Sequence, residues 1–132
     1  MSFTEVEIEY LNSQRLGRLA SVSPTGAPQN NPVAFRYNPE TGTIDIGGHN
    51  LTASRKFCNI QVEPRVAFVV DDLASTNPWR ARGVEIRGRA EALTDVEPPH
   101  PYFDSAMIRI RPTRIITWGI DGAPMSGRNV ES

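Results

Sequence analysis

The sequence has little cysteine, little histidine and almost no net charge. Cys58 is the only cysteine, so the chain forms no internal disulfide and suits a reducing compartment. A net charge of −1 over 132 residues gives no overall field that would attract nucleic acid or an anionic membrane. No apolar run approaches the roughly 20 residues of a membrane span, and the acidic N-terminus lacks the basic start of a signal peptide. We therefore expect a cytoplasmic protein that binds neither nucleic acid nor membranes.

Arginine is the one abundant cation, and its distribution also argues against nucleic acid. Seven arginines fall between Arg80 and Arg114, but acidic residues are interspersed among them. The segment also lacks the aromatic interleaving of a platform for single strands. This pattern is more typical of a solvated barrel face or of a salt-bridged dimer contact.

The common catalytic motifs are missing too. His49 and His100 have no partner at metal-ligand spacing, so we expect no metal site. Neither a Gly-x-Ser-x-Gly elbow nor a phosphate loop is present. Cys58 follows the apolar Phe57 and is more typical of a small core residue than of a nucleophile. His100, between prolines, is typical of a surface loop, whereas His49 adjoins a Gly-Gly turn and contacts either a ligand or solvent.

The pattern that is present is mainly β, with ten glycines and eleven prolines to form turns. Alternating or apolar runs predict strands at 16–22, 29–37, 43–46, 65–71 (buried on both faces), 84–93, 106–112 and 113–120, with helices at 4–14 and 50–62 and a loop at 71–78. Six or so antiparallel segments with short helices predict a closed or nearly closed barrel. We expect one domain over 1–132, with a polar tail from about 121 to 132 that a partner would order.

Three of the predicted strands contain residues that disturb pairing. Pro32 cannot donate to a ladder, so its strand is an edge or carries a bulge, and its unpaired groups face either a ligand or solvent. Gly88 predicts a bend or bulge, and Pro112 predicts a kink between the last two strands. Gly47 and Gly48 permit close approach of the backbone to another group.

The start of the second helix carries two cations in an unfavourable place. Thr52 or Ser54 can cap this helix, and Arg55 and Lys56 then fall in its first turn. Lys56 is the only lysine, against thirteen arginines. A cation in the first turn is disfavoured by about 0.3–1 kcal/mol, because the helix dipole is positive there. A bound phosphate would explain the pair, and a solvated helix start is the alternative. With a phosphate site but no catalytic motif, a cofactor would carry the chemistry.

Six segments in order match a known family: 17–22, 26–28, 31–35, 54–60, 64–71 and 84–91. Over roughly residues 10–120 the chain resembles the flavin- and deazaflavin-binding split barrels related to pyridoxamine 5′-phosphate oxidase. It is most similar to the actinobacterial branch that uses the deazaflavin coenzyme F420.

This resemblance implies a six-stranded antiparallel split β-barrel and a homodimer with its cofactor at the subunit interface. Ser54, Arg55 and Lys56 would hold the cofactor phosphate, with Asn59 nearby. The ring would lie along Asn30, Asn31, Pro32 and Val33, with Ile46, Gly47 and Gly48 at its edge, and Trp79, Arg80 and Trp118 would approach from the partner chain.

The chain departs from the family pattern at two places. Its end, 125–132, lacks the segment with arginine and histidine that holds the substrate phosphate in pyridoxamine phosphate oxidases, which argues against the vitamin B6 reaction. Ala34 stands where a tryptophan is often found, so the ring pocket would be roomier.

The expected function is an oxidoreductase that moves a hydride from reduced coenzyme F420 to a small organic acceptor. FMN in the same fold and a non-catalytic carrier of flavin or deazaflavin are the alternatives. A haem-binding relative is disfavoured, because His49 and His100 are the only histidines.

Overall fold

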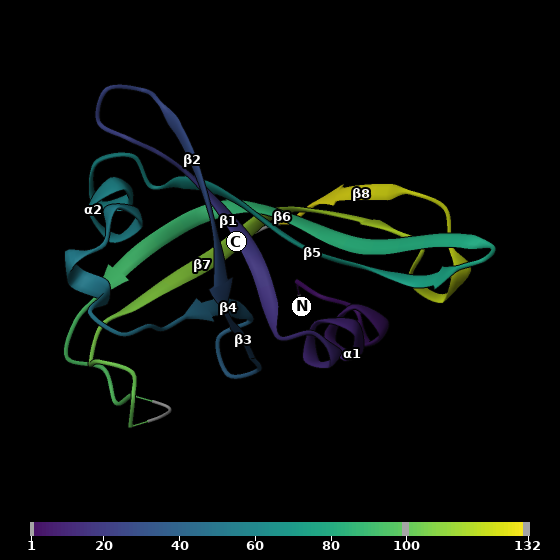
Figure 1. The fold of residues 1–132 in the computed structure, drawn as a ribbon, viewed down its shortest axis with the longest axis horizontal. Coiled ribbons are helices and arrows are strands. Elements are labelled where there is room, and N and C mark those ends of the chain that lie inside the picture. Colours follow the sequence, from purple (N-terminus) through teal and green to yellow (C-terminus); the bar gives the residue numbers. More distant parts are fainter. Residues whose placement is uncertain (1, 99–100, 131–132) are drawn as a thin grey trace.

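The computed structural model describes residues 2–98 and 101–130 and is mainly β, with a curled antiparallel sheet and two short α-helices (Figure 1). The elements of this part of the chain are α1 (Glu5–Ser13), β1 (Leu16–Val22), β2 (Pro28–Ala34), β3 (Arg36–Asn38), β4 (Thr43–Ile46), the 3-10 turn η1 (Leu51–Ala53), α2 (Arg55–Val62), β5 (Arg65–Thr76), β6 (Trp79–Leu93), β7 (Met107–Trp118), the 3-10 turn η2 (Ile120–Gly122) and β8 (Ser126–Asn129). Within the same residues, no helix has the length and apolar character needed to cross a membrane.

The sheet is an open barrel. Its strands follow the order β2-β1-β5-β6-β7-β4-β3, and β8 pairs with β7. The two ends of this order, β2 and β3, are consecutive in the chain and separated only by Phe35, yet they do not pair with each other. The predicted split barrel is therefore confirmed. The described residues form eight strands rather than six, because Phe35 divides the strand predicted over 29–37 and the C-terminal segment adds β8.

That C-terminal segment is ordered within the chain itself. Strand β8 pairs with β7, and Arg128 donates from its two Nη atoms to the Glu7 carboxylate at 2.6 and 2.8 Å. Glu7 is fixed from the other side by the predicted capping box, in which the Thr4 N–H donates to Glu7 Oε1 at 2.9 Å. No partner is needed to order residues 126–130, contrary to our expectation. Residues 131–132 and His100 lie outside the described residues.

The loop predicted over 71–78 is wrong. Strand β5 continues to Thr76, turns at Asn77 and Pro78 through a cis peptide bond, and pairs with β6 from Trp79 onward. The two strands form an arm that projects from the barrel (Figure 1). Buried and partly exposed residues alternate along the first half of β5, so the prediction of burial on both faces is also wrong.

The proline and glycine positions behave largely as predicted. Pro32 lies on β2, which pairs only with β1 in the described sheet and is an edge strand. Gly88 faces Pro112, and Thr113 is left out of the ladder between β6 and β7, which makes a bulge. Because the irregularity in pairing near Pro112 is confined to this bulge, β7 continues through Pro112 as one strand rather than as the two predicted segments.

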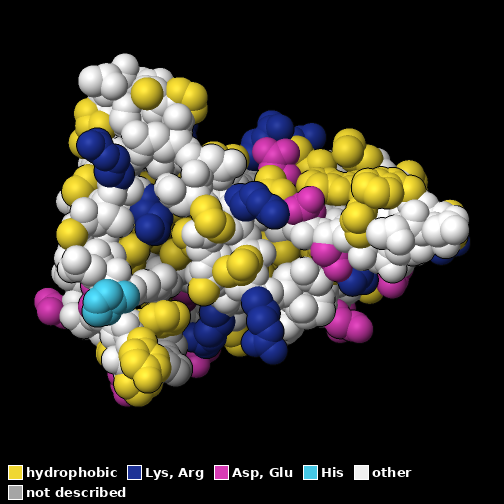
Figure 2. Space-filling view, in the orientation of Figure 1, with side chains coloured by type: hydrophobic (Ala, Val, Ile, Leu, Met, Phe, Trp, Pro, Cys, Tyr) yellow, Lys and Arg dark blue, Asp and Glu magenta, His cyan; other side chains and the backbone are white. Residues whose placement is uncertain are grey.

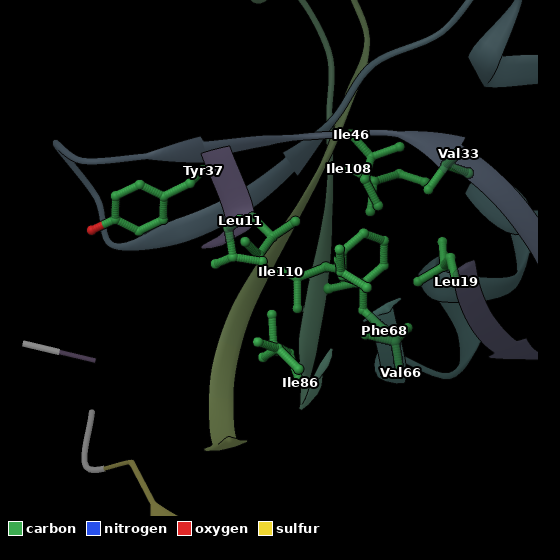
Figure 3. Packing of buried hydrophobic residues seen from close by; sticks show 14 of the residues in the cluster. Leu11, Leu19, Val33, Tyr37, Ile46, Val66, Phe68, Ile86, Ile108 and Ile110 are labelled. Carbon is green, nitrogen blue, oxygen red and sulfur yellow. The ribbon is translucent and has the colours of Figure 1, made fainter. Parts of the chain in front are cut away.

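The core lies inside the curled sheet. Phe68, on β5, is fully buried at its centre, with Leu19, Val33, Ile108 and Ile110 around it (Figure 3). Along each strand, these core residues alternate with residues that point to the outer face. The outer surface of the sheet, including the β2 edge, is therefore available to ligands or partners.

Candidate functional site

Strand β2 and the start of α2 enclose a hollow of about 500 Å³, which we call the β2–α2 hollow. It is lined by Gln29, Asn30, Asn31, Ser54, Arg55 and Lys56. Five of these six residues were predicted from the sequence, although the two segments lie more than twenty residues apart. The structure therefore brings the expected phosphate-binding residues together with the first half of the expected ring-binding strand.

The helix start is built by Ser54, which confirms one of the two predicted caps. Its Oγ accepts from the Phe57 N–H at 3.3 Å and donates to the Leu51 carbonyl at 2.6 Å. Thr52, the other candidate, belongs to the preceding turn η1. The first N–H groups of a helix have no acceptor within it, so the amides of Arg55 and Lys56 remain available for an anion.

Among the described residues, the side chains of Arg55 and Lys56 have no carboxylate partner. Seven arginines of the described chain form ion pairs with Asp or Glu, but neither Arg55 nor Lys56 forms an ion pair or side-chain hydrogen bond within residues 2–98 and 101–130. Arg55 is exposed and Lys56 is half-buried. Their positive charge is thus directed into the hollow and is not neutralised by the protein.

Asn59 supports the hollow from behind. It is buried, with 3% of its surface exposed, and its Nδ2 donates to Ser21 Oγ at 3.1 Å and to Gln29 Oε1 at 2.8 Å. These bonds tie α2 to both β1 and β2. Because Asn59 uses its donor on the protein, it positions the hollow rather than facing it.

Two residues expected beside the ring are in the core. The side chains of Val33 and Ile46 are 6% and 0% exposed and pack inside the sheet (Figure 3). Only their backbone atoms can therefore contact a ligand on the outer face. Asn30, Asn31 and Pro32 are exposed.

The Gly47-Gly48 pair approaches a segment of the protein itself. A Cβ on Gly47 would lie 2.9 Å from the ring of Phe103, and the Asp104 N–H donates to the Gly48 carbonyl at 3.0 Å.

His49, next to the glycine pair, is exposed. Cys58 is also exposed, so its prediction as a core residue is wrong.

A second cavity of about 520 Å³, which we call the α1–β4 pocket, was predicted only in part, through Gly47 at the expected ring edge and Ala34 in the expected ring pocket. It is lined by Asn12, Ser13, Gln14, Arg15, Leu16, Ala34, Phe35, Arg36, Asp45, Gly47, Phe103 and Met107. A further sequence signal for it, which the prediction did not use, is Asp45, a carboxylate within the short apolar strand β4.

Asp45 is a satisfied, fixed negative charge. Arg109 donates to it from Nε at 3.0 Å and Nη2 at 3.1 Å, Asn38 Nδ2 at 2.9 Å and Thr43 Oγ1 at 2.8 Å. Burial opposes its ionisation, but the bonds from Arg109, Asn38 and Thr43 outweigh burial and hold its pKa below the ordinary 3.8. Asp45 is therefore unsuited to donate a proton near neutral pH.

Trp79, Arg80 and Trp118 lie away from the β2–α2 hollow. Trp79 is 70% exposed and lines, with Arg80, a separate hollow of about 560 Å³ near the end of the β5–β6 arm. Trp118 packs over Gly83, where any Cβ would collide with its ring. The arm extends away from α2 (Figure 1), and hydrophobic side chains gather beside it on the surface around β8 (Figure 2). A single chain does not bring these three residues to the predicted site.

A sequence profile described as pyridoxamine 5′-phosphate oxidase matches residues 3–119 of this barrel. The chain belongs to the pyridoxamine 5′-phosphate oxidase family. Within it, the chain is 48% identical over 128 residues to the 5a,11a-dehydrotetracycline/5a,11a-dehydrooxytetracycline reductase of Streptomyces rimosus, covering 96% of this chain and 90% of the relative.

Solved structures agree with this membership. An F420 reductase is 28% identical, with a TM-score of 0.59 over 76% of this chain and 88% of the other. A pyridoxamine 5′-phosphate oxidase-related, FMN-binding protein from Nostoc punctiforme, 15% identical, shows the same fold with a TM-score of 0.65 over 100% of both chains. The reductase relatives and the family support an oxidoreductase, for which a flavin or deazaflavin is a plausible cofactor.

Proposed function

We propose that this oxidoreductase binds reduced coenzyme F420 through the β2–α2 hollow and transfers a hydride to an unsaturated organic acceptor. The observation that carries the proposal is the unpaired Arg55 and Lys56 beside two available amides, facing an exposed edge strand. FMN is the alternative cofactor, because it also joins a flat ring system to a phosphate-bearing side chain.

The spacing along β2 suits such a molecule. Asn31 lines the β2–α2 hollow and Ala34 lines the α1–β4 pocket. A strand rises about 3.3 Å per residue, so these positions lie about 10 Å apart on one edge. A phosphate anchored at Lys56 would leave a ring system lying along Pro32, between the two cavities.

The cofactor would supply the hydride, and the protein would supply anchoring and orientation. Arg55, Lys56 and the first-turn amides would hold the phosphate. The carboxamides of Asn30 and Asn31 can donate to or accept from polar atoms of the ring. The described residues that line the hollow include no carboxylate, histidine or cysteine, so any proton would come from solvent or from the cofactor.

The reductase of Streptomyces rimosus, whose name gives dehydrotetracyclines as its substrates, supports a proposal for the acceptor class. At 48% identity we propose an acceptor of similar chemistry, a polycyclic compound with a conjugated double bond. 5a,11a-Dehydrotetracycline is therefore the first acceptor to test.

The working unit that we propose is a homodimer. Trp79 is exposed at the end of an arm that one chain directs away from its own hollow, and Leu73 and Met125 are further exposed hydrophobic residues, at 42% and 70%. A second copy that covers these residues would place the arm of one chain near the hollow of the other.

The test is a fluorescence titration with coenzyme F420 and, separately, with FMN. Each charge-assisted bond to phosphate contributes about 1.5–3 kcal/mol, so Arg55→Ala with Lys56→Ala is expected to weaken F420 binding by several kcal/mol, with Arg55 at the low end because it is exposed. Arg89→Ala is the control, because Arg89 is exposed on β6 and lines neither cavity. Unchanged affinity in the double variant would refute the phosphate site.

Further outcomes separate the alternatives. Tighter binding of FMN than of F420 would identify the flavin as the cofactor, and F420 binding without turnover of any acceptor would indicate a carrier. Mixing the Arg55/Lys56 variant with a Trp79→Ala, Arg80→Ala variant should restore part of the binding only if each site combines two chains. No restoration after subunit exchange would contradict the shared site.

A further inference from the structure

The α1–β4 pocket combines apolar walls with cations. Its apolar lining comes from β1, the end of β2, the segment before β7 and β7 itself: Leu16, Ala34, Phe35, Phe103 and Met107. Arg15 and Arg36 line it as exposed side chains, so they lie at its rim. A volume of about 520 Å³ falls within the usual range for small-molecule sites.

The described residues do not balance the charge of this pocket. Asp45 is the one carboxylate among the described lining residues, and each of its oxygens already accepts two hydrogen bonds, including the pair from Arg109. Arg36 lies opposite Asp45 in the ladder between β3 and β4 but forms no ion pair with it. Within the described part of the chain, neither Arg36 nor Arg15 has an ion pair or a side-chain hydrogen bond. Two positive charges are thus left at the rim of an apolar cavity.

We propose that the α1–β4 pocket binds a flat, apolar molecule with an anionic oxygen group, such as a phenolate, enolate or carboxylate, and that Arg15 and Arg36 select for the anionic group. The apolar walls take the body of the molecule, and the guanidinium groups form charge-assisted bonds with the oxygen at the rim. The assignment of this pocket to the acceptor rests on the proposed function. Its preference for an anionic aromatic ligand does not.

The pocket differs in chemistry from the β2–α2 hollow. That hollow is lined by carboxamides, a hydroxyl and cations, which suit a phosphate and a polar chain. Five of the twelve residues that line the α1–β4 pocket have aromatic or aliphatic side chains, whereas the β2–α2 hollow has none. Because both lie along the β2 edge, a ligand in the α1–β4 pocket would adjoin a ring placed over Pro32.

Two fluorescent probes with nearly the same skeleton test the charge preference without any cofactor. 8-Anilino-1-naphthalenesulfonate carries an anionic group, and N-phenyl-1-naphthylamine lacks it. Both are titrated into the full-length protein, the Arg15→Gln, Arg36→Gln variant and an Arg89→Gln control. We expect the double variant to lose about tenfold or more in affinity for the sulfonate, and the neutral probe to bind as before.

A second variant tests the location. Ala34 is exposed on β2 and lines the pocket, so Ala34→Trp adds bulk there without disturbing the core. It should weaken both probes. An unchanged ratio of the two affinities in the Arg15/Arg36 variant, or unchanged binding of both probes to Ala34→Trp, would overturn the proposal. Failure of coenzyme F420 to bind would leave these probe results unaffected, so the two proposals fail separately.

Discussion

Replacing Asn59 by leucine tests whether a buried amide holds the β2–α2 hollow together. The two side chains are similar in size, so the change removes hydrogen bonds without leaving a large cavity. Asn59 Nδ2 donates to Ser21 Oγ at 3.1 Å and to Gln29 Oε1 at 2.8 Å. Both bonds are lost, and α2 is then joined to β1 and β2 by apolar contacts alone in this region.

The expected cost follows from the burial of the two acceptors. Each intramolecular hydrogen bond contributes about 0.5–1.5 kcal/mol net, and a buried polar group left without its partner costs about 1–3 kcal/mol. Ser21 is 2% exposed and stays without its donor, whereas Gln29 is half-buried and can turn to water. We expect Asn59→Leu to lower the free energy of unfolding by about 2–4 kcal/mol.

Urea denaturation measures this loss in the free energy of unfolding, and a double-mutant cycle tests how much of it comes from the bond between Asn59 and Ser21. In a Ser21→Ala background no hydroxyl is left unpaired, so Asn59→Leu should cost about 1 kcal/mol less than in the wild-type background. F420 affinity should fall in the single variant, because Gln29 and the α2 start lose their common anchor. A cost below about 0.5 kcal/mol, or an equal cost in both backgrounds, would refute the reasoning.

Two further predictions concern the frame around the site. Gly17→Ala would place a Cβ in steric collision with Cζ of the fully buried Phe68. The melting temperature should therefore fall by an amount that corresponds to about 1–3 kcal/mol, and Phe68→Leu in the same chain should recover part of this loss. Glu7 has a pKa below 4.5, because the bonds from Arg128 and Thr4 outweigh burial. The stabilisation from ionised Glu7 is therefore fully present above the pKa that Glu7 has in the unfolded chain, and it is lost as the pH falls through the pKa of Glu7 in the folded chain. Glu7→Gln should lower the free energy of unfolding at pH 7 and make it fall less steeply as the pH decreases. Equal acid profiles for the two proteins would contradict this assignment.

The sequence predicted those parts of the fold in which periodicity reports burial. Strand β1 alternates between the core and the outer face and was predicted with its observed bounds. The β5–β6 arm was missed because it leaves the core, and a strand with neither face buried, such as the stretch from Asp71 to Thr76, has the composition of a loop. The tail was misread for a similar reason, since β8 is held by backbone pairing and by the Arg128–Glu7 ion pair rather than by apolar side chains.

Some residues of the candidate site could likewise be predicted from the sequence, and others could not. Arg55 and Lys56 could be found from the sequence because a pair of cations in a first turn is electrostatically unfavourable wherever the chain folds. The α1–β4 pocket could be found only in part, through Gly47 and Ala34, because the rest of its lining comes from separate elements and Asp45 alone stands out among those residues. Trp79 raises a different difficulty, since the role proposed for it depends on a second chain.

The placement of unpaired cations connects the two cavities. The chain has 15 acidic residues for 14 basic ones, so carboxylates are numerous enough to pair with the cations. Seven arginines are indeed paired, among them Arg109 and Arg128, whose carboxylate partners are buried. The cavities at the two ends of the β2 edge each keep two cations that have no such partner among the described residues. An edge strand with positive charge at both ends and an uncharged centre around Pro32 is suited to hold two anionic molecules with their apolar parts facing each other. That arrangement would suit the hydride transfer that we propose between a phosphate-anchored ring and an anionic acceptor, and it is why we place the proposed reaction over β2.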